Sequence, residues 1–372
     1  MRIGVVGGGQ LARMMIPAAI QLGLDLEVLA EADGSSARLA ATAVGDTLDL
    51  DTVLGFARGV DVLTFDHEHV PQPVLAALVE AGVVVRPGPA ALQYAQDKLR
   101  MREHLEALGF PVPDWAPVVT AGELDAFLAA HGGVAVLKTA RGGYDGKGVR
   151  VVRSAAEAAD WIDAAAAGGP PLLVEEAVAF TRELAQQVAR RPGGELAVYP
   201  LVESVQRDGV CAEVIAPAPH AGRVAQAAAR IATGIAEALE VVGMLAVELF
   251  ETDDGRILVN ELAMRPHNSG HWSIEGTVTS QFEQHLRAVA DLPLGSADAR
   301  EPWTVMVNIL GGPADGSLDR ARRQALAAQP AVAVHLYGKS PRPGRKLGHV
   351  TASGLDLDDV AYRARAAAAV FD

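Results

Sequence analysis

Several side chains that could do chemistry together lie close to one another near residue 260. Glu248 lies on one predicted strand, and the run from Asn260 to His271 begins at the end of another and adds a second carboxylate, an amide, a guanidinium and two imidazoles. Mg²⁺ in proteins is usually held by one or two carboxylates together with substrate phosphates. Guanidinium groups bind planar anions well. These residue types therefore predict a magnesium-nucleotide site with an adjoining anion pocket.

The spacing of the two glutamates predicts a hairpin. Residues 244–251 and 256–263 are apolar and typical of strands, and 252–255 is a turn signal. With two central turn residues, Glu248 and Glu261 share one face of the hairpin, roughly 5–8 Å apart. A three-residue loop would place them on opposite faces. Like charges this close favour a cation between them, although two exposed surface glutamates are the alternative.

A glycine-rich loop connects two further predicted strands. Residues 134–138 and 149–153 read as strands, and Gly142 to Gly148 contains four glycines between them. Backbone N–H groups of such a loop can bind phosphates, and Lys138 could reach the same phosphates. The loop is not a P-loop, because it lacks the Gly-Lys-Ser/Thr ending and no helix follows. A surface hairpin without a ligand is the alternative.

Four cations lie on one loop near the C-terminus of this acidic chain. Predicted strands at 332–337 and 346–351 flank Gly338 to Lys346, which contains two lysines and two arginines. Such a cluster favours a phosphate ligand, and a solvated basic loop is the alternative.

The first hundred residues alternate strand and helix, which predicts a parallel sheet. Strands are expected at 2–6, 26–30, 60–65 and 83–86, and a helix at 10–22. The first turn reads Gly7-x-Gly9-x-x-Ala12, and Glu31 follows the second strand. This pattern by itself would indicate a dinucleotide site, but any sharp strand-to-helix turn needs small residues.

Size and composition limit the possibilities further. A chain of 372 residues suggests two or three domains. The net charge of −14 argues against nucleic acid or an anionic membrane as a partner. The single cysteine, Cys211, fits a reducing cytoplasm. No apolar run approaches a membrane span, and the glycines after Val6 argue against a signal peptide.

In this order, Lys138, the glycine-rich hairpin, Glu175 and the Glu248/Glu261 pair resemble the ATP-grasp enzymes. More specific phrases resemble the 5-(carboxyamino)imidazole ribonucleotide synthase family of purine biosynthesis, and this resemblance covers essentially the whole chain. These phrases are Gly8–Leu11, Thr64-Phe65 with Glu68–Val70, Gly142–Gly148, Asn260-Glu261 with Arg265–Trp272, and Arg342–Lys346.

The resemblance implies an α/β fold with three parts. Residues 1–97 would form a Rossmann-like domain with a parallel sheet, and residues 98–295 an α+β ATP-grasp domain. Residues 296–372 would form a small β-rich domain that contributes the ribonucleotide phosphate site. A cytoplasmic homodimer is expected by analogy.

The resemblance also implies a carbon–nitrogen ligase reaction. ATP would phosphorylate bicarbonate to carboxyphosphate, and the amine of 5-aminoimidazole ribonucleotide would then be carboxylated. Nucleotide contacts would come from Lys98, Lys138, Gly142, Gly143, Tyr144, Asp145, Gly146, Lys147, Gly148, Glu175, Glu176, Ala177, Val178, Glu183, Gln206, Asn260 and Glu261. Mg²⁺ would be carried by Glu248 and Glu261. Catalytic roles would fall to Tyr144, Asp145, Arg265, His267 and Asn268. Ribonucleotide contacts would come from Gln10, Glu68, Tyr144, Asp145, Lys339, Arg345 and Lys346.

Four positions depart from the family pattern, namely Ala12, Asp66-His67, Gln206 and Met264. Gln206 puts one nucleotide contact in doubt. Other readings stay open: a formate-dependent transformylase, an NAD oxidoreductase and a non-catalytic nucleotide-binding protein. The spacings of His67/His69 and His267/His271 disfavour zinc, because neither has the HExxH arrangement.

Overall fold

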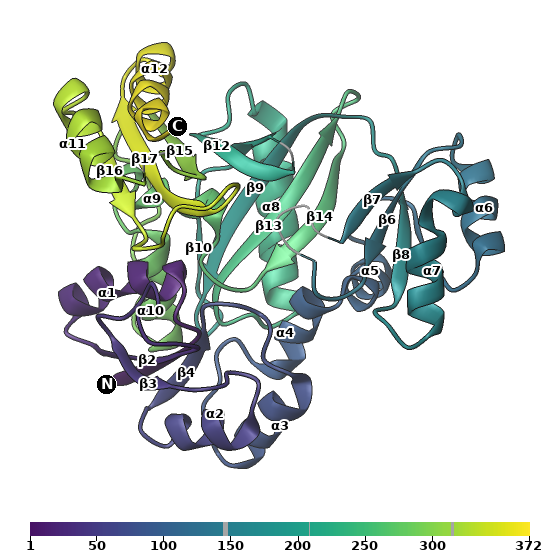
Figure 1. The fold of residues 1–372 in the computed structure, drawn as a ribbon, viewed down its shortest axis with the longest axis horizontal. Helices are drawn as coiled ribbons and strands as arrows, with labels where there is room; N and C mark the ends of the chain where they lie inside the picture. The colour runs from purple at the N-terminus through teal and green to yellow at the C-terminus, as the bar shows by residue number, and fades with distance from the viewer. Residues whose placement is uncertain (144–147, 208, 314–315) are drawn as a thin grey trace.

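The computed structural model describes residues 1–143, 148–207, 209–313 and 316–372 (Figure 1). Tyr144, Asp145, Gly146 and Lys147 lie outside the described residues. The predicted roles of these four residues therefore stay predictions.

The N-terminal part is built on a parallel sheet, as predicted. Its strands β1 (Arg2–Val6), β2 (Asp25–Ala30), β3 (Ala41–Val44) and β4 (Val62–Phe65) lie in the order β3-β2-β1-β4. Helices α1 (Gln10–Leu22), α2 (Leu50–Ala57) and α3 (Gln72–Glu80) connect and follow them. The strand expected at 83–86 is only a bridge between Leu63 and Val85. Pro87, which follows it, has no N–H to extend the ladder.

Two helices lead from this part to a small antiparallel sheet. They are α4 (Pro89–Gln96) and α5 (Lys98–Ala107). The sheet has the order β5-β8-β6-β7, with β5 (Trp115–Val118), β6 (Ala135–Thr139), β7 (Val149–Val152) and β8 (Leu172–Glu176). Helices α6 (Ala121–Ala130) and α7 (Ala159–Ala166) pack on it, and η1 (Ala155–Ala158) precedes α7. Lys138 pairs with Val149, so the glycine-rich segment does connect an antiparallel hairpin.

The third sheet has nine strands and carries most of the remaining chain. Its order is β14-β13-β9-β11-β12-β15-β17-β16, and β10 pairs with β9. The strands are β9 (Phe180–Arg190), β10 (Leu196–Val198), β11 (Val202–Arg207), β12 (Val210–Ala216), β13 (Gly243–Thr252), β14 (Ile257–Ala263), β15 (Trp303–Leu310), β16 (Ala333–Leu336) and β17 (Lys346–Gly354). All its strand pairs are antiparallel.

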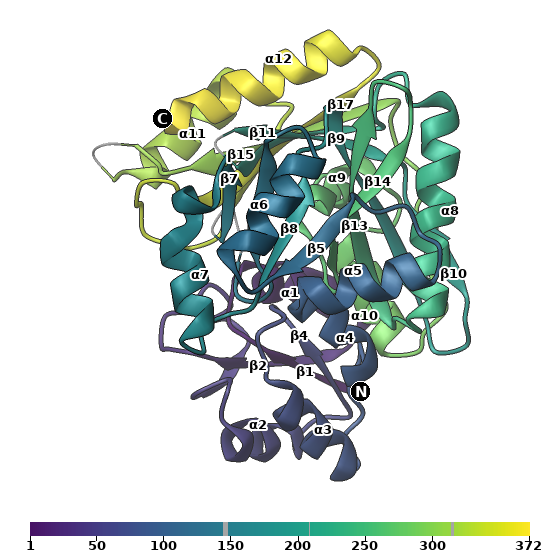
Figure 2. The ribbon, with the colours of Figure 1, turned by 90° about the vertical axis from the view of Figure 1, so that its right-hand side faces the viewer.

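Helices cover this sheet from several sides. They are α8 (Gly222–Ala238), α9 (Ser273–Gly276), α10 (Gln281–Val289), α11 (Leu318–Ala328) and α12 (Leu357–Ala368), with the short turns η2 (Asn268–Gly270) and η3 (Ala369–Phe371). Helix α8 packs against β9 and β13, and Figure 2 shows α12 over the end of the sheet that holds β15 and β17.

The C-terminal strands do not form a separate sheet. β15 pairs with β12, so the large sheet crosses the predicted boundary at residue 295. The predicted domain limits stay predictions. A shared apolar core joins the N-terminal part to the large sheet, since Val6 and Leu63 belong to one cluster with Val188 and Leu245. In the described part of the chain, no helix has the length and apolar character that a bilayer crossing requires.

Candidate functional site

A cavity of about 1260 Å³ lies where the parts of the chain meet. Most of the predicted site residues that the structure describes line it: Glu68, Lys98, Lys138, Gly142, Gly143, Glu175, Glu176, Ala177, Val178, Glu183, Gln206, Glu248, Asn260, Glu261, Arg265, His267, Asn268 and Lys346. The tertiary structure therefore brings together residues that lie almost 280 positions apart in the sequence.

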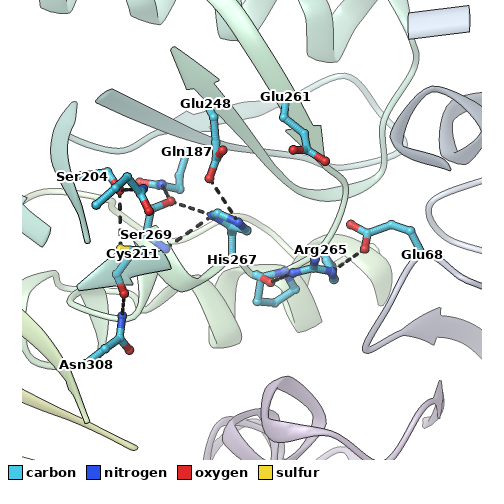
Figure 3. Close-up of polar contacts among 12 residues, drawn as sticks. Glu68, Gln187, Ser204, Cys211, Glu248, Glu261, Arg265, His267, Ser269 and Asn308 are labelled. Atoms are coloured by element: carbon cyan, nitrogen blue, oxygen red, sulfur yellow. Dashed lines mark hydrogen bonds and ion pairs between the residues drawn. The ribbon is translucent and has the colours of Figure 1, made fainter. Parts of the chain in front are cut away.

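The two glutamates of the predicted hairpin are direct cross-strand neighbours, as Figure 3 shows. The loop that leads to this pairing differs from the predicted one. The N–H of Thr252 donates to the carbonyl of Arg256, so the loop has three residues rather than two. The predicted two-residue turn is therefore wrong, and the register next to the loop would place Glu248 opposite Asn260.

A β-bulge restores the pairing of the carboxylates. Leu249 pairs with Val259 but Glu248 pairs with Glu261, so Asn260 is the extra residue on β14. A bulge leaves one residue without a ladder partner and reverses the side-chain alternation beyond it. Glu248 and Glu261 consequently share a face despite the three-residue loop.

The carboxylate pair has the electrostatics of a cation site. Burial, together with the charges of Glu261 and Glu183, raises the pKa of Glu248 to about 7. Lys98 Nζ lies 2.9 Å from Glu261 Oε1 and partly compensates the negative charge. The repulsion between the two carboxylates costs free energy in the absence of a cation. Such a pair of oxygen ligands suits a hard divalent cation whose remaining ligands are phosphates and water. The residues present therefore fit Mg²⁺.

A second cluster surrounds Glu175 at the end of β8. Lys138 Nζ lies 2.6 Å from one oxygen of Glu175, and Arg102 Nε lies 2.6 Å from the other. Burial by itself would raise the pKa of Glu175, but the charges of Arg102 and Lys138 lower it to about 2. Lys138 also donates to Asn260 Oδ1 at 3.1 Å, which connects this cluster to the bulge.

The predicted anion pocket lies on the segment that follows β14 (Figure 3). Arg265 Nε lies 2.7 Å from Glu68 Oε2, which orients the guanidinium. The buried Asn268 lines the cavity beside Arg265, and its amide has no hydrogen-bond partner in the described part of the chain. Burial and the charge of Arg265 hold the pKa of His267 well below its usual range. His267 is therefore neutral at pH 7, with its Nε2 3.5 Å from Glu248 Oε1.

The basic C-terminal loop forms a second cavity of about 290 Å³ against the N-terminal glycine turn. Its lining includes Gly8, Gly9, Ser35, Lys339 and Arg345. Lys339 Nζ donates to Gln10 Oε1 at 2.7 Å, so two of the predicted ribonucleotide contacts touch each other across 329 positions of sequence. Because Lys346 lines the larger cavity, the loop contacts both spaces.

The dinucleotide-like turn at Gly7–Ala12 binds carboxylates of the chain itself. Asp66 Oδ1 accepts the N–H of Ala12 at 2.7 Å, so a partly buried carboxylate of the chain occupies the N-terminal end of α1. A Cβ on Gly9 would lie 1.9 Å from Asp66 Oδ2, which explains the glycine. Glu31 accepts from the N–H of Gly8 and lies 3.4 Å from His67. A pyrophosphate would meet Asp66 and Glu31 at this turn, which disfavours the NAD reading.

Two other departures from the family pattern, Met264 and Gln206, lie in different surroundings. Met264 is buried in the apolar core and does not line the larger cavity. Gln206 does line that cavity, where its side chain donates to Ser204 Oγ at 2.9 Å.

The sequence prediction missed several residues of the site. Phe180 and Phe250 stack at 4.7 Å between ring centroids on the cavity wall, where they offer an apolar surface for a planar base. Asp97 caps the N-terminus of α5 and accepts a hydrogen bond from Arg141, which precedes the glycine loop. An acidic residue before a helix is a recognisable capping signal. Arg102 lies four residues after Lys98, but no local signal indicates its role.

Comparisons with protein families cover nearly the whole chain. Residues 1–96 match the ribonucleotide synthetase preATP-grasp domain, residues 103–282 the ATP-grasp domain, and residues 304–363 the phosphoribosylaminoimidazole carboxylase C-terminal domain.

Individual relatives agree with these matches. The chain is 52% identical over 371 residues to the N5-carboxyaminoimidazole ribonucleotide synthase of Mycobacterium tuberculosis H37Rv, covering 98% of this chain and 86% of the relative. It is 49% identical over 374 residues to that of Corynebacterium ammoniagenes, covering 98% and 91%. The structure matches the Aspergillus clavatus N5-carboxyaminoimidazole synthase, solved with ADP and 5-aminoimidazole ribonucleotide, with a TM-score of 0.90. That match has 32% identity and covers 99% and 98% of the two chains.

Proposed function

The chain belongs to the N5-carboxyaminoimidazole ribonucleotide synthase family of ATP-grasp enzymes, and we propose that it carboxylates 5-aminoimidazole ribonucleotide with bicarbonate at the expense of ATP. One observation carries this proposal. A single cavity contains both the Glu248/Glu261 pair and the anion-binding group of Arg265 and Asn268, and Lys346 of the basic loop reaches the same cavity.

The nucleotide would lie between the small and the large sheet. Lys98 and Lys138 would bind its phosphates, while Glu175–Val178 and Glu183 would line the adenosine pocket beside Phe180 and Phe250. Glu248 and Glu261 would hold Mg²⁺, which when bound neutralises negative charge on the phosphates. The backbone at Gly142, Gly143 and Gly148 would contribute further phosphate contacts.

The phosphoryl transfer would proceed at the anion pocket. An oxygen of bicarbonate attacks the γ-phosphorus, the bond to the β-phosphate oxygen breaks, and ADP leaves with that electron pair. Arg265, held by Glu68, and Asn268 would bind the bicarbonate and then carboxyphosphate. Neutral His267 adds a hydrogen-bonding group to this pocket without adding a charge.

The carboxylation step needs the ribonucleotide next to carboxyphosphate. The exocyclic amine forms a C–N bond to the carboxyl carbon, phosphate leaves, and the amine loses a proton. Lys339, Arg345 and Lys346 would bind the ribonucleotide phosphate, and Gln10 and Glu68 would contact the rest of the substrate. Excluding water would protect carboxyphosphate from hydrolysis.

The proposal is tested by measuring ADP release. We expect release to require both bicarbonate and 5-aminoimidazole ribonucleotide, and the carboxylated ribonucleotide to appear in equal amount. Full turnover without the ribonucleotide would contradict the proposal. Formate should not replace bicarbonate, and a formylated product would favour the transformylase reading instead.

We further propose that the protein acts as a homodimer in the cytoplasm. The single cysteine, Cys211, is buried and unpaired, which fits a reducing compartment. Light scattering of the purified protein at assay concentration tests the dimer, and a monomeric mass would contradict it.

A further inference from the structure

Helix α5 connects the elements of the proposed nucleotide site. It begins at Lys98, which contacts Glu261, and it carries Arg102 one turn later. Arg102 is completely buried and lines neither cavity, so it cannot bind a ligand directly. Figure 1 shows α5 beside the small sheet, on the side of the large one.

The guanidinium of Arg102 joins two sheets. Its Nε donates to Glu175 Oε1 on β8 at 2.6 Å, and its Nη2 donates to the carbonyl of Asn260 on β14 at 2.7 Å. Lys138 contacts the same two residues, through Glu175 Oε2 at 2.6 Å and Asn260 Oδ1 at 3.1 Å. The four residues form a closed ring, and of its two cations only Lys138 faces the cavity.

We propose that Arg102 is a positioning residue for phosphoryl transfer. It holds Lys138 and the bulge at Asn260 in place, and the bulge in turn positions Glu261. The geometry that results is the one that binds Mg²⁺ and ATP. The inference rests on the proposed function for the roles of Lys138 and Glu261. It adds a residue that touches no substrate.

Charge sharing explains why Lys138 needs this partner. Glu175 is a single carboxylate between two cations, so the ring keeps one net positive charge, which faces the cavity at Lys138. Without Arg102, the negative charge of Glu175 would fully compensate the positive charge of Lys138, and Lys138 would attract phosphates less strongly. The bond to the carbonyl of Asn260 acts on the bulge itself, which determines the face on which Glu261 lies.

Stability alone does not account for a cation at this position. Buried ion pairs recover their desolvation cost only with good geometry and full hydrogen bonding, and apolar replacements are often neutral or stabilising. Arg102 Nη1 has no hydrogen-bond partner among the described residues, so the ring is not fully satisfied.

The test compares Arg102→Lys and Arg102→Met with the control Arg365→Lys. Lysine keeps the charge, but its single ammonium lacks the planar fork that spans Glu175 and Asn260. Arg365 is a suitable control because it makes two bonds to the buried Glu213, at 2.8 and 2.6 Å, and lies outside both cavities.

For Arg102→Lys we expect the KM for ATP and the half-saturating Mg²⁺ concentration each to rise about tenfold, as for one lost charged hydrogen bond. The KM for 5-aminoimidazole ribonucleotide should stay within about twofold of the wild-type value, because Arg102 contacts no residue of the basic C-terminal loop. Arg102→Met should show a larger rise in the same two quantities, and the control should change none of the three.

Two results would overturn the inference. One is an Arg102→Lys enzyme with wild-type ATP and Mg²⁺ dependence. The other is a parallel rise in all three constants together with a lowered melting temperature, which a loosened fold would produce. If Arg102→Met does not fold, Arg102→Lys decides alone. If wild-type ADP release does not require bicarbonate and ribonucleotide, the proposed function fails, while the ATP comparison still tests Arg102.

Discussion

Replacing Glu248 by glutamine should stabilise the metal-free protein while it removes activity. Burial and the neighbouring charges of Glu261 and Glu183 raise the pKa of Glu248 to about 7 from a reference value of 4.5. The folded protein therefore holds the ionised carboxylate at a cost that the unfolded chain does not have. Glutamine has nearly the shape of the protonated acid and is never charged, so the variant avoids this cost.

The size and sign of the effect follow from linkage. A rise of about 2.5 pKa units corresponds to about 3 kcal/mol at 1.36 kcal/mol per unit. Since 26% of the Glu248 side chain is exposed, solvent reduces this to about 2 kcal/mol. A raised carboxyl pKa contributes stability that is fully present below about pH 4.5 and is lost as the pH rises through 7. The advantage of the variant should thus be below about 1 kcal/mol at pH 5 and about 2 kcal/mol at pH 8.

Urea unfolding in the presence of EDTA at several pH values measures this difference. Glu106→Gln is the control, because Glu106 is exposed on α5 and its removal should leave the pH profile of the wild type unchanged. The reasoning is refuted if Glu248→Gln is no more stable than the wild type at pH 8, or if its advantage does not depend on pH. Saturating Mg²⁺ and ATP should stabilise the wild type more than the variant.

Three further predictions concern other parts of the molecule. Glu261→Ala should lower turnover by more than about a hundredfold with an unchanged circular dichroism spectrum, and retained ADP release would show that the Mg²⁺ assignment is wrong. Lys339→Ala should raise the KM for the ribonucleotide by about tenfold or more and leave the KM for ATP unchanged in steady-state assays. His285 Nε2 donates to Thr64 Oγ1 at 2.8 Å, because its Nδ1 accepts the N–H of Met244, and burial lowers the pKa of His285 to about 3. Its stabilisation is present above pH 6.5 and lost as the pH falls, so between pH 7 and 5 the stability of the wild type relative to His285→Asn should fall by about 2 kcal/mol in urea unfolding.

Local patterns predicted many of the elements well. The strand over Arg2–Val6 and the helix over Gln10–Leu22 have the predicted bounds, and the parallel sheet follows from the alternation of strands and helices. These predictions succeed because apolar periodicity and turn residues act over a few positions. The predicted strand at 83–86 failed because pairing there ends at a single bridge.

The Glu248/Glu261 hairpin was predicted correctly in one respect and wrongly in another. The residue types indicated a cation site, and the two carboxylates do share a face. The loop length was wrong, however, and only the bulge at Asn260 corrected the register. Alternation along a strand does not reveal an inserted residue, because a bulge depends on the partner strand and on groups such as Arg102 that bind its free carbonyl.

The sequence by itself determined the order of the elements, the acidic hairpin, the glycine loop and the basic loop, since each depends on neighbouring residues. Only the tertiary structure decided that Arg102 joins Glu175 to Asn260, that Glu68 orients Arg265, and that Lys339 meets Gln10. Those contacts span up to 329 positions of sequence. They arise from the packing of whole sheets against one another, which no local periodicity encodes.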